Sequence, residues 1–140
     1  MPDLIVVNGR GVDLSGRFAH SETVVGSPAA AAETIIGSVP IPSGLTITNG
    51  VLLTGWAAFT VGTSGTACTL RLRQTNVAGT VKATSGALTG GVAAANLVSF
   101  DIQGFDASPA DSQIYVLTLT VTGGAATSTV SAVQITATAV

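Results

Sequence analysis

The feature that most constrains the fold of this chain is a period-two alternation of apolar and polar residues from position 33 onward. Such alternation is typical of β-strands whose two faces meet different surroundings. Clusters of Gly, Pro, Asn and Ser interrupt it repeatedly, and no segment carries a helical stripe of roughly ten residues. The pattern predicts eight strands, at 33–41, 45–48, 51–61, 66–75, 81–84, 97–104, 112–122 and 127–140.

Eight short strands separated by turn residues are typical of a sandwich or a barrel. We predict an all-β fold, an eight-stranded, jelly-roll-like antiparallel β-sandwich, with an immunoglobulin-like sandwich as the second choice. Within strand 33–41 we expect Ile35 to face the core, and we expect Asn49-Gly50 to form a hairpin turn. Cys68 alternates with Leu70 and Leu72, which predicts a small buried hydrophobic side chain.

Residues 1–32 differ from the rest of the chain and hold about half of its ionisable side chains. We expect an extended N-terminal arm over 1–32 and a β-sandwich domain over 33–140. A disordered terminus is the alternative, but the run Leu4-Ile5-Val6-Val7 is too apolar to be left exposed. The residues we expect to contact a capsid or another subunit are Leu4, Ile5, Val6, Val7, Arg10, Arg17 and Phe18.

Charge is scarce in this protein. Charged residues make up 9% of 140 residues and the net charge is −2, against about 25% charged residues in a typical soluble domain. Nucleic-acid binding needs clustered Lys and Arg, and five scattered basic residues argue against it. No apolar run reaches the 18 or so residues of a spanning helix, and Asp3 stands where a signal peptide has basic residues. We therefore expect no membrane partner. So little charge also predicts a surface covered by neighbouring copies, with a monomer covered by Thr and Ser side chains as the alternative.

The sequence lacks the combinations of residues that catalysis requires. The chain has one histidine, His20, and one cysteine, Cys68, whereas acid–base catalysis, a nucleophilic triad or a zinc site needs several such groups together. Asp106 and Asp111 could form a weak calcium site, but an acidic turn is the preferred interpretation. We expect no enzymatic activity, no metal and no cofactor.

Some strands are apolar on both faces, which predicts that an outer sheet face packs against a partner. Ile114 and Val116 oppose an already apolar face, and Trp56 opposes the side of its strand that bears Phe59. Arg71 and Arg73 share the outward face of one strand, where they could hold a carboxylate. The candidate interface residues are therefore Trp56, Arg71, Arg73, Ile114 and Val116.

The segment Glu33-Thr34-Ile35-Ile36-Gly37-Ser38-Val39-Pro40-Ile41-Pro42-Ser43-Gly44 resembles the opening strand of small jelly-roll proteins of tailed-phage particles. Segments 51–74 and 130–138 are similar to the same group, which includes capsid decoration (cement) proteins and fibre domains. The resemblance covers residues 33–140. It implies a β-sandwich, often trimeric, bound to a capsid through an N-terminal arm.

From these observations we expect a virion structural protein on the capsid surface that decorates and stabilises the capsid. Its expected partners are itself, as a homotrimer, and the major capsid protein. The alternative is a fibre-type module that binds a receptor or a carbohydrate through exposed aromatic residues, namely Trp56, Phe105 or Tyr115.

Overall fold

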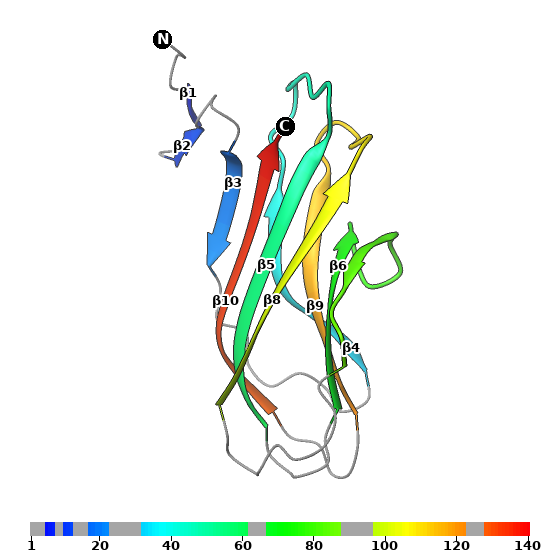
Figure 1. Ribbon diagram of the computed structural model, residues 1–140. Coiled ribbons are helices and arrows are strands. Elements are labelled where there is room, and N and C mark those ends of the chain that lie inside the picture. The colour runs from blue at the N-terminus through cyan, green and yellow to red at the C-terminus, as the bar shows by residue number, and fades with distance from the viewer. Residues whose placement is uncertain are drawn as a thin grey trace.

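The computed structural model describes residues 5–7, 10–12, 17–22, 32–61, 67–87, 97–122 and 128–140, and its regular structure there consists of strands. Two four-stranded antiparallel sheets pack face to face as the layers of a sandwich (Figure 1). The described residues contain no helix that is long and apolar enough to cross a membrane. The strands are β1 (Ile5–Val7), β2 (Arg10–Val12), β3 (Arg17–Glu22), β4 (Glu33–Pro40), β5 (Val51–Val61), β6 (Ala67–Gln74), β7 (Val81–Thr84), β8 (Leu97–Asp106), β9 (Ile114–Thr122) and β10 (Ser128–Ala139).

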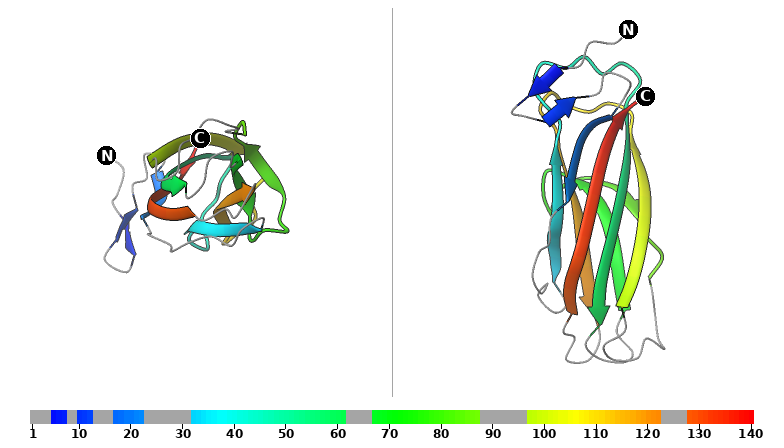
Figure 2. Two further views of the ribbon diagram at one scale, coloured as in Figure 1. Left: turned by 90° about the horizontal axis from the view of Figure 1, so that it is seen from below. Right: turned by 90° about the vertical axis from the view of Figure 1, so that its left-hand side faces the viewer.

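The strand order is that of a jelly roll. One sheet has the order β3-β10-β5-β8 and the other has the order β4-β9-β6-β7, while β1 and β2 form a separate two-stranded sheet. From β3 to β10, every connection crosses between the two large sheets except the β6–β7 connection. This arrangement confirms the predicted all-β, jelly-roll-like sandwich, and Figure 2 shows the two layers from below and from the side.

The predicted number of sandwich strands is right, but one member is wrong. Segment 45–48 is not a strand, because residues 41–50 carry the chain from β4 in one sheet to β5 in the other. Asn49-Gly50 is accordingly not a hairpin turn, although Gly50 does adopt a left-handed φ of 106°. The missing member is β3, which pairs with β10 at the edge of its sheet. It lies within the segment assigned to the arm, so the sandwich begins earlier than predicted.

The core lies between the two sheets and follows the predicted alternation closely. Cys68 is buried, as expected. Strand β4 departs from the prediction, because a β-bulge between Ile35 and Gly37 shifts its register against β9. As a result Ile36 faces the core, while Ile35 faces outward and is exposed. Other fully buried core residues are Val39, Val51, Leu53, Phe59, Leu70, Leu72, Tyr115, Leu117, Leu119 and Ile135.

Two glycines allow strands of opposite sheets to approach closely. A Cβ on Gly37 of β4 would lie 2.7 Å from Val133 Cγ1 of β10. A Cβ on Gly104 of β8 would lie 3.1 Å from Ala83 Cβ of β7. Each glycine therefore sits where a larger side chain would push the two layers apart.

Candidate functional site

One buried carboxylate ties the two sheets together. Asp106, at the end of β8, is 3% exposed. Its Oδ2 accepts hydrogen bonds from Gln74 Nε2 at 2.7 Å and Tyr115 Oη at 2.8 Å. Its Oδ1 accepts from Lys82 Nζ at 3.0 Å and from the Ser108 amide at 3.2 Å. Because Gln74, Lys82 and Tyr115 belong to three strands of the opposite sheet, this cluster is a clamp between the layers.

The environment of Asp106 explains its ionisation. Burial alone would raise the pKa of its carboxyl group, but the hydrogen bonds from Lys82, Tyr115, Ser108 and Gln74 outweigh burial and lower the pKa below its usual value. The pKa of Tyr115 is raised, first by burial and then by its bond to the charged Asp106. All of these groups are engaged with one another, so the cluster stabilises the fold and offers no free acid or base.

A second polar cluster lies on the outer face of the β4-β9-β6-β7 sheet. Arg73 donates from Nε to Glu33 Oε1 at 2.6 Å and from Nη2 to Glu33 Oε2 at 2.9 Å, a bidentate ion pair. Thr118 donates to the same Oε1 at 2.5 Å. Burial raises the pKa of Glu33, but the bonds from Arg73 and Thr118 and the charges of both arginines lower it overall.

Arg71 is used much less than Arg73 in this cluster. The third donor nitrogen of Arg73 bonds to the Gly79 carbonyl at 2.9 Å, so each of the three guanidinium nitrogens has a partner. Arg71 donates only from Nη1, to Thr120 Oγ1 at 3.1 Å, and that atom lies 3.7 Å from Glu33 Oε2. Nε and Nη2 of Arg71 have no partner among the described residues, and its side chain is 28% exposed.

Exposed apolar side chains surround this cluster, and we call the whole surface the Arg71 face. Ile35 lies on β4, Ile114 at the start of β9 and Val81 at the start of β7, and each is about two fifths exposed. Val116 was also expected to contact a partner, and this prediction is wrong. It is 2% exposed, between its cross-strand neighbours Ser38 and Arg73, so it has little surface left to offer.

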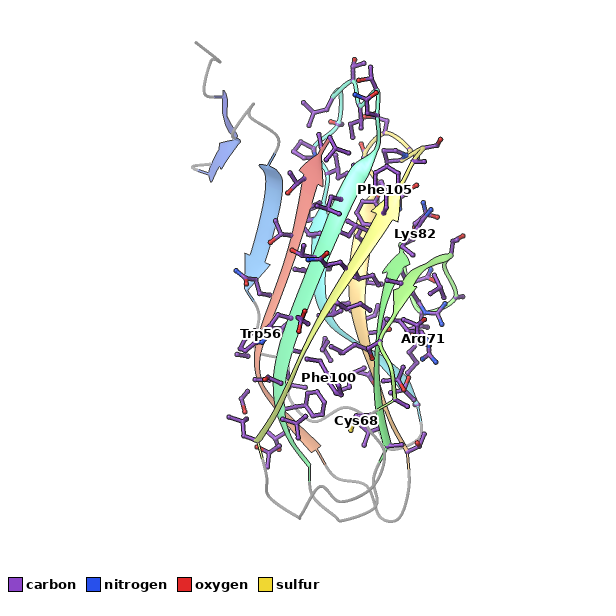
Figure 3. All side chains as sticks on the ribbon, in the orientation of Figure 1. Trp56, Cys68, Arg71, Lys82, Phe100 and Phe105 are labelled. Atoms are coloured by element: carbon purple, nitrogen blue, oxygen red, sulfur yellow. The ribbon has the colours of Figure 1, made fainter. Side chains whose placement is uncertain are left out.

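The opposite side of the sandwich carries a second candidate surface, which we call the Trp56 face. Its members point outward from β5 and β8. Trp56 is 37% exposed and lies directly across from Asp101, while Leu52 lies across from Phe105. Leu97, at the far end of β8, is 67% exposed. Trp56 and Arg71 project from opposite sides of the molecule (Figure 3).

Aromatic residues that were expected to bind a carbohydrate are divided by the fold. Trp56 and Phe105 are exposed on one face, as that hypothesis needs. Tyr115 is not available, because it is fully buried and its hydroxyl donates to Asp106. Its position on the apolar face of β9 was visible in the alternation of that strand, whereas its buried acceptor was not, because Asp106 comes from the other sheet.

The predicted arm contacts fall on backbone segments whose side chains lie outside the described residues. Ile5, Val6 and Val7 form β1, and Arg10 begins β2, where it pairs with Val7. Arg17 and Phe18 lie in β3, and Arg17 pairs with Thr138 of β10. Leu4 falls outside the described residues. Their predicted contacts with a capsid or a neighbouring subunit stay predictions.

The acidic residues also contribute to the loops. Asp111 accepts a hydrogen bond at Oδ1 from the Gly44 amide at 2.8 Å and so fixes the loop after β4. Asp106 is occupied by the clamp described above. Among the described residues, no group of three or more His, Cys, Asp or Glu side chains is arranged to hold a metal ion.

Comparisons with known proteins support the architecture. No protein-family model matches the sequence, and no curated protein matches it either. Among solved structures, a chain of infectious bursal disease virus (Gx strain) is similar, with a TM-score of 0.53 and 12% identity over 98% of this chain. This chain spans 36% of the viral chain. A protein of Bacillus endospore appendages, described as disulfide-linked pili, has a TM-score of 0.46 and 18% identity over the full length of both chains. The viral likeness shows a shared fold.

Proposed function

We propose that this protein is a non-catalytic structural subunit that works by packing against neighbouring subunits in a particle. The observation that carries the proposal is the presence of exposed apolar side chains on both outer sheet faces of a chain with few charges. Exposed apolar side chains that lie side by side, as Leu52 and Phe105 do, mark a site of association. The two polar clusters support this proposal, because Glu33 and Asp106 bind Arg73 and Lys82 of other strands. Their charges therefore stabilise the fold and leave few charges to keep copies apart.

In its finer form the proposal is a virion protein that decorates and stabilises a capsid. The sandwich would form a homotrimer, and the residues before β3 would reach the major capsid protein. Many weak contacts made by linked copies would reinforce one another through their high effective concentration. A jelly roll shared with a viral chain fits this role, and the resemblance to small phage proteins is a second support.

The mass of the purified protein in solution, measured by light scattering over a range of concentrations, tests the proposal. We expect a closed oligomer, and the homotrimer predicts three times the monomer mass of 13.7 kDa. A monomer at every concentration would contradict self-association. A chain that starts after β2 then tests the arm, because this truncation keeps β3 in its sheet. It should keep the oligomer and lose capsid binding.

A fibre-type module that binds a receptor glycan is the second candidate. The observation that favours it is the Trp56 face, where an exposed indole lies across from Asp101. Gln103 lies two residues further along β8, opposite Thr54. An aromatic ring flanked by polar groups can stack on a sugar and bond its hydroxyls. Titration with a panel of glycans, followed by quenching of Trp56 fluorescence, would separate this function from the first.

A further inference from the structure

We propose that the Trp56 face of one copy docks on the Arg71 face of the next copy, with Asp101 paired to Arg71 at the centre. This inference rests on the proposed function, and it names the partner as a second copy and specifies the two surfaces that meet. Such an interface joins two different patches and is therefore heterologous.

The first argument is the accounting of charges among the side chains that the structure describes. Glu33 and Arg73 form a bidentate pair, and Lys82 is paired with Asp106. Asp111 accepts from the Gly44 amide. Arg71 keeps two unused donor nitrogens, and exposed Asp101 makes no hydrogen bond or ion pair within the described part of the chain. These two groups are thus the charges left without a full partner.

The second argument is complementarity between the two faces. Glu33, Arg71 and Arg73 leave one net positive charge on the Arg71 face, and Asp101 is the charge on the described part of the Trp56 face. A carboxylate suits the free Nε–Nη2 edge of a guanidinium, which can donate two parallel hydrogen bonds. Two like faces meeting each other would instead bring equal charges together, which opposes association.

The third argument is that each charge is set among apolar side chains. Asp101 lies across from Trp56, with Leu52 and Phe105 further along the same two strands. Arg71 lies across from Thr118, whose other neighbour on the sheet is the exposed Ile35. When the faces meet, these apolar groups exclude water from the ion pair, which is how a charge pair at the centre of an interface gains strength.

The geometry has a consequence for the assembly. The two faces belong to opposite sheets and point away from each other across the sandwich (Figure 3). A copy that uses both faces therefore has two neighbours, and the result is a closed ring or an open chain, depending on the rotation between copies.

Charge reversal tests the interface. The variants are Asp101→Arg and Arg71→Glu, and solution mass is the measurement. Each variant alone should associate at least about thirtyfold more weakly than the wild type, since it places like charges at a buried contact. An equimolar mixture should associate again, because each variant then meets a partner of opposite charge on both faces; strict alternation of the two variants is possible in an open chain or a ring with an even number of copies. Asp111→Asn, which removes a carboxylate outside both faces, should assemble normally.

Two further measurements keep the result unambiguous. Arg71→Glu places a carboxylate near Glu33 and could weaken the fold, so thermal unfolding of each variant is recorded, and Arg71→Gln provides a milder loss of charge at the same site. A wild-type monomer would overturn both the proposed function and this inference. A wild-type oligomer that both reversals leave unchanged, or that responds to one reversal alone, would overturn only the inference, as would folded variants that stay dissociated when mixed.

Discussion

At the scale of single residues, the clamp around Asp106 shows how a chain with few charges uses one of them. A buried carboxylate is costly unless hydrogen bonds replace its hydration. Here four donors do so, and three of them come from side chains of the facing sheet. One residue thereby connects β8 with β6, β7 and β9.

The two paired carboxylates, Asp106 and Glu33, predict a loss of stability in acid. The pKa values of Asp106 and Glu33 are both lowered in the folded protein. Their contribution to the free energy of unfolding is therefore present above the ordinary carboxyl pKa of about 4, and it is lost as the pH falls through the lowered folded values. Urea unfolding followed from pH 7 to pH 3 should show a flat midpoint at neutral pH and a steep decline in acid.

Asp106→Asn provides the comparison for this pH series. We expect it to lower the free energy of unfolding by about 3 kcal/mol at neutral pH, because Lys82 is left without its anion. Its decline in acid should be shallower than that of the wild type. Asp111→Asn is the control and should keep wild-type stability at neutral pH, because the amide oxygen of asparagine can still accept from the Gly44 amide. Equal declines for Asp106→Asn and the wild type would show that Asp106 is not a source of the acid sensitivity.

At the scale of elements, the sheets are held at a fixed spacing by small residues that face larger ones. Gly37 lies at the bulge in β4, and its missing side chain makes room for Val133 of β10 in the opposite sheet. Gly104 likewise lets β8 approach β7 closely, because a side chain at this position would meet Ala83. Packing between layers therefore depends on positions that no strand pattern marks as special.

Gly37→Ala tests this spacing. The added methyl would lie 2.7 Å from Val133 Cγ1, inside a closed core, and we expect a loss of about 1–3 kcal/mol in urea unfolding. Gly86→Ala is the matched control, since nothing lies within 4 Å of the position of its Cβ. The double variant Gly37→Ala/Val133→Ala should lose less stability than the sum of the losses of the two single variants, because the smaller side chain at position 133 relieves the clash. A loss equal to the sum of the two single losses would argue against this contact.

The elements also show what the sequence can and cannot predict. Strict alternation located β5, β6 and β9 and their buried faces, because each of these strands keeps one inner side along its length. The same rule misplaced Ile35, since a bulge adds one residue and reverses the faces on one side of it. Asn49-Gly50 has hairpin chemistry, but the choice between hairpin and crossover is made by pairing partners distant in sequence.

The candidate surfaces were predictable to the same extent. Arg71 and Arg73 were placed outward by alternation alone, and the structure agrees. That every guanidinium nitrogen of Arg73 has a partner, while two of Arg71 have none among the described residues, depends on Glu33, which lies forty residues before Arg73 along the chain. Val116 was predicted as an interface residue because alternation gives the side of a sheet, whereas burial on that side depends on the neighbours across the strands.

At the scale of the whole molecule, the single tryptophan lies on one of the two faces proposed to meet. Trp56 fluorescence should therefore report association. We expect the emission maximum to move to shorter wavelength as the protein concentration rises, because docking removes water from the indole. Asp101→Arg should abolish this shift while the variant remains folded. A spectrum independent of concentration, in a protein whose mass increases, would place Trp56 outside the contact.

The position of β10 has a consequence for biosynthesis. It lies between β3 and β5, although it is the last strand of the eight to be made. Until it has left the ribosome, β3 has no neighbour in its sheet, and β5 has β8 alone. The β4-β9-β6-β7 sheet can pair first, whereas the other layer must wait for residue 139. Nascent chains stalled before β10 should therefore be digested by protease in β3 and β5, and chains stalled well after it should resist.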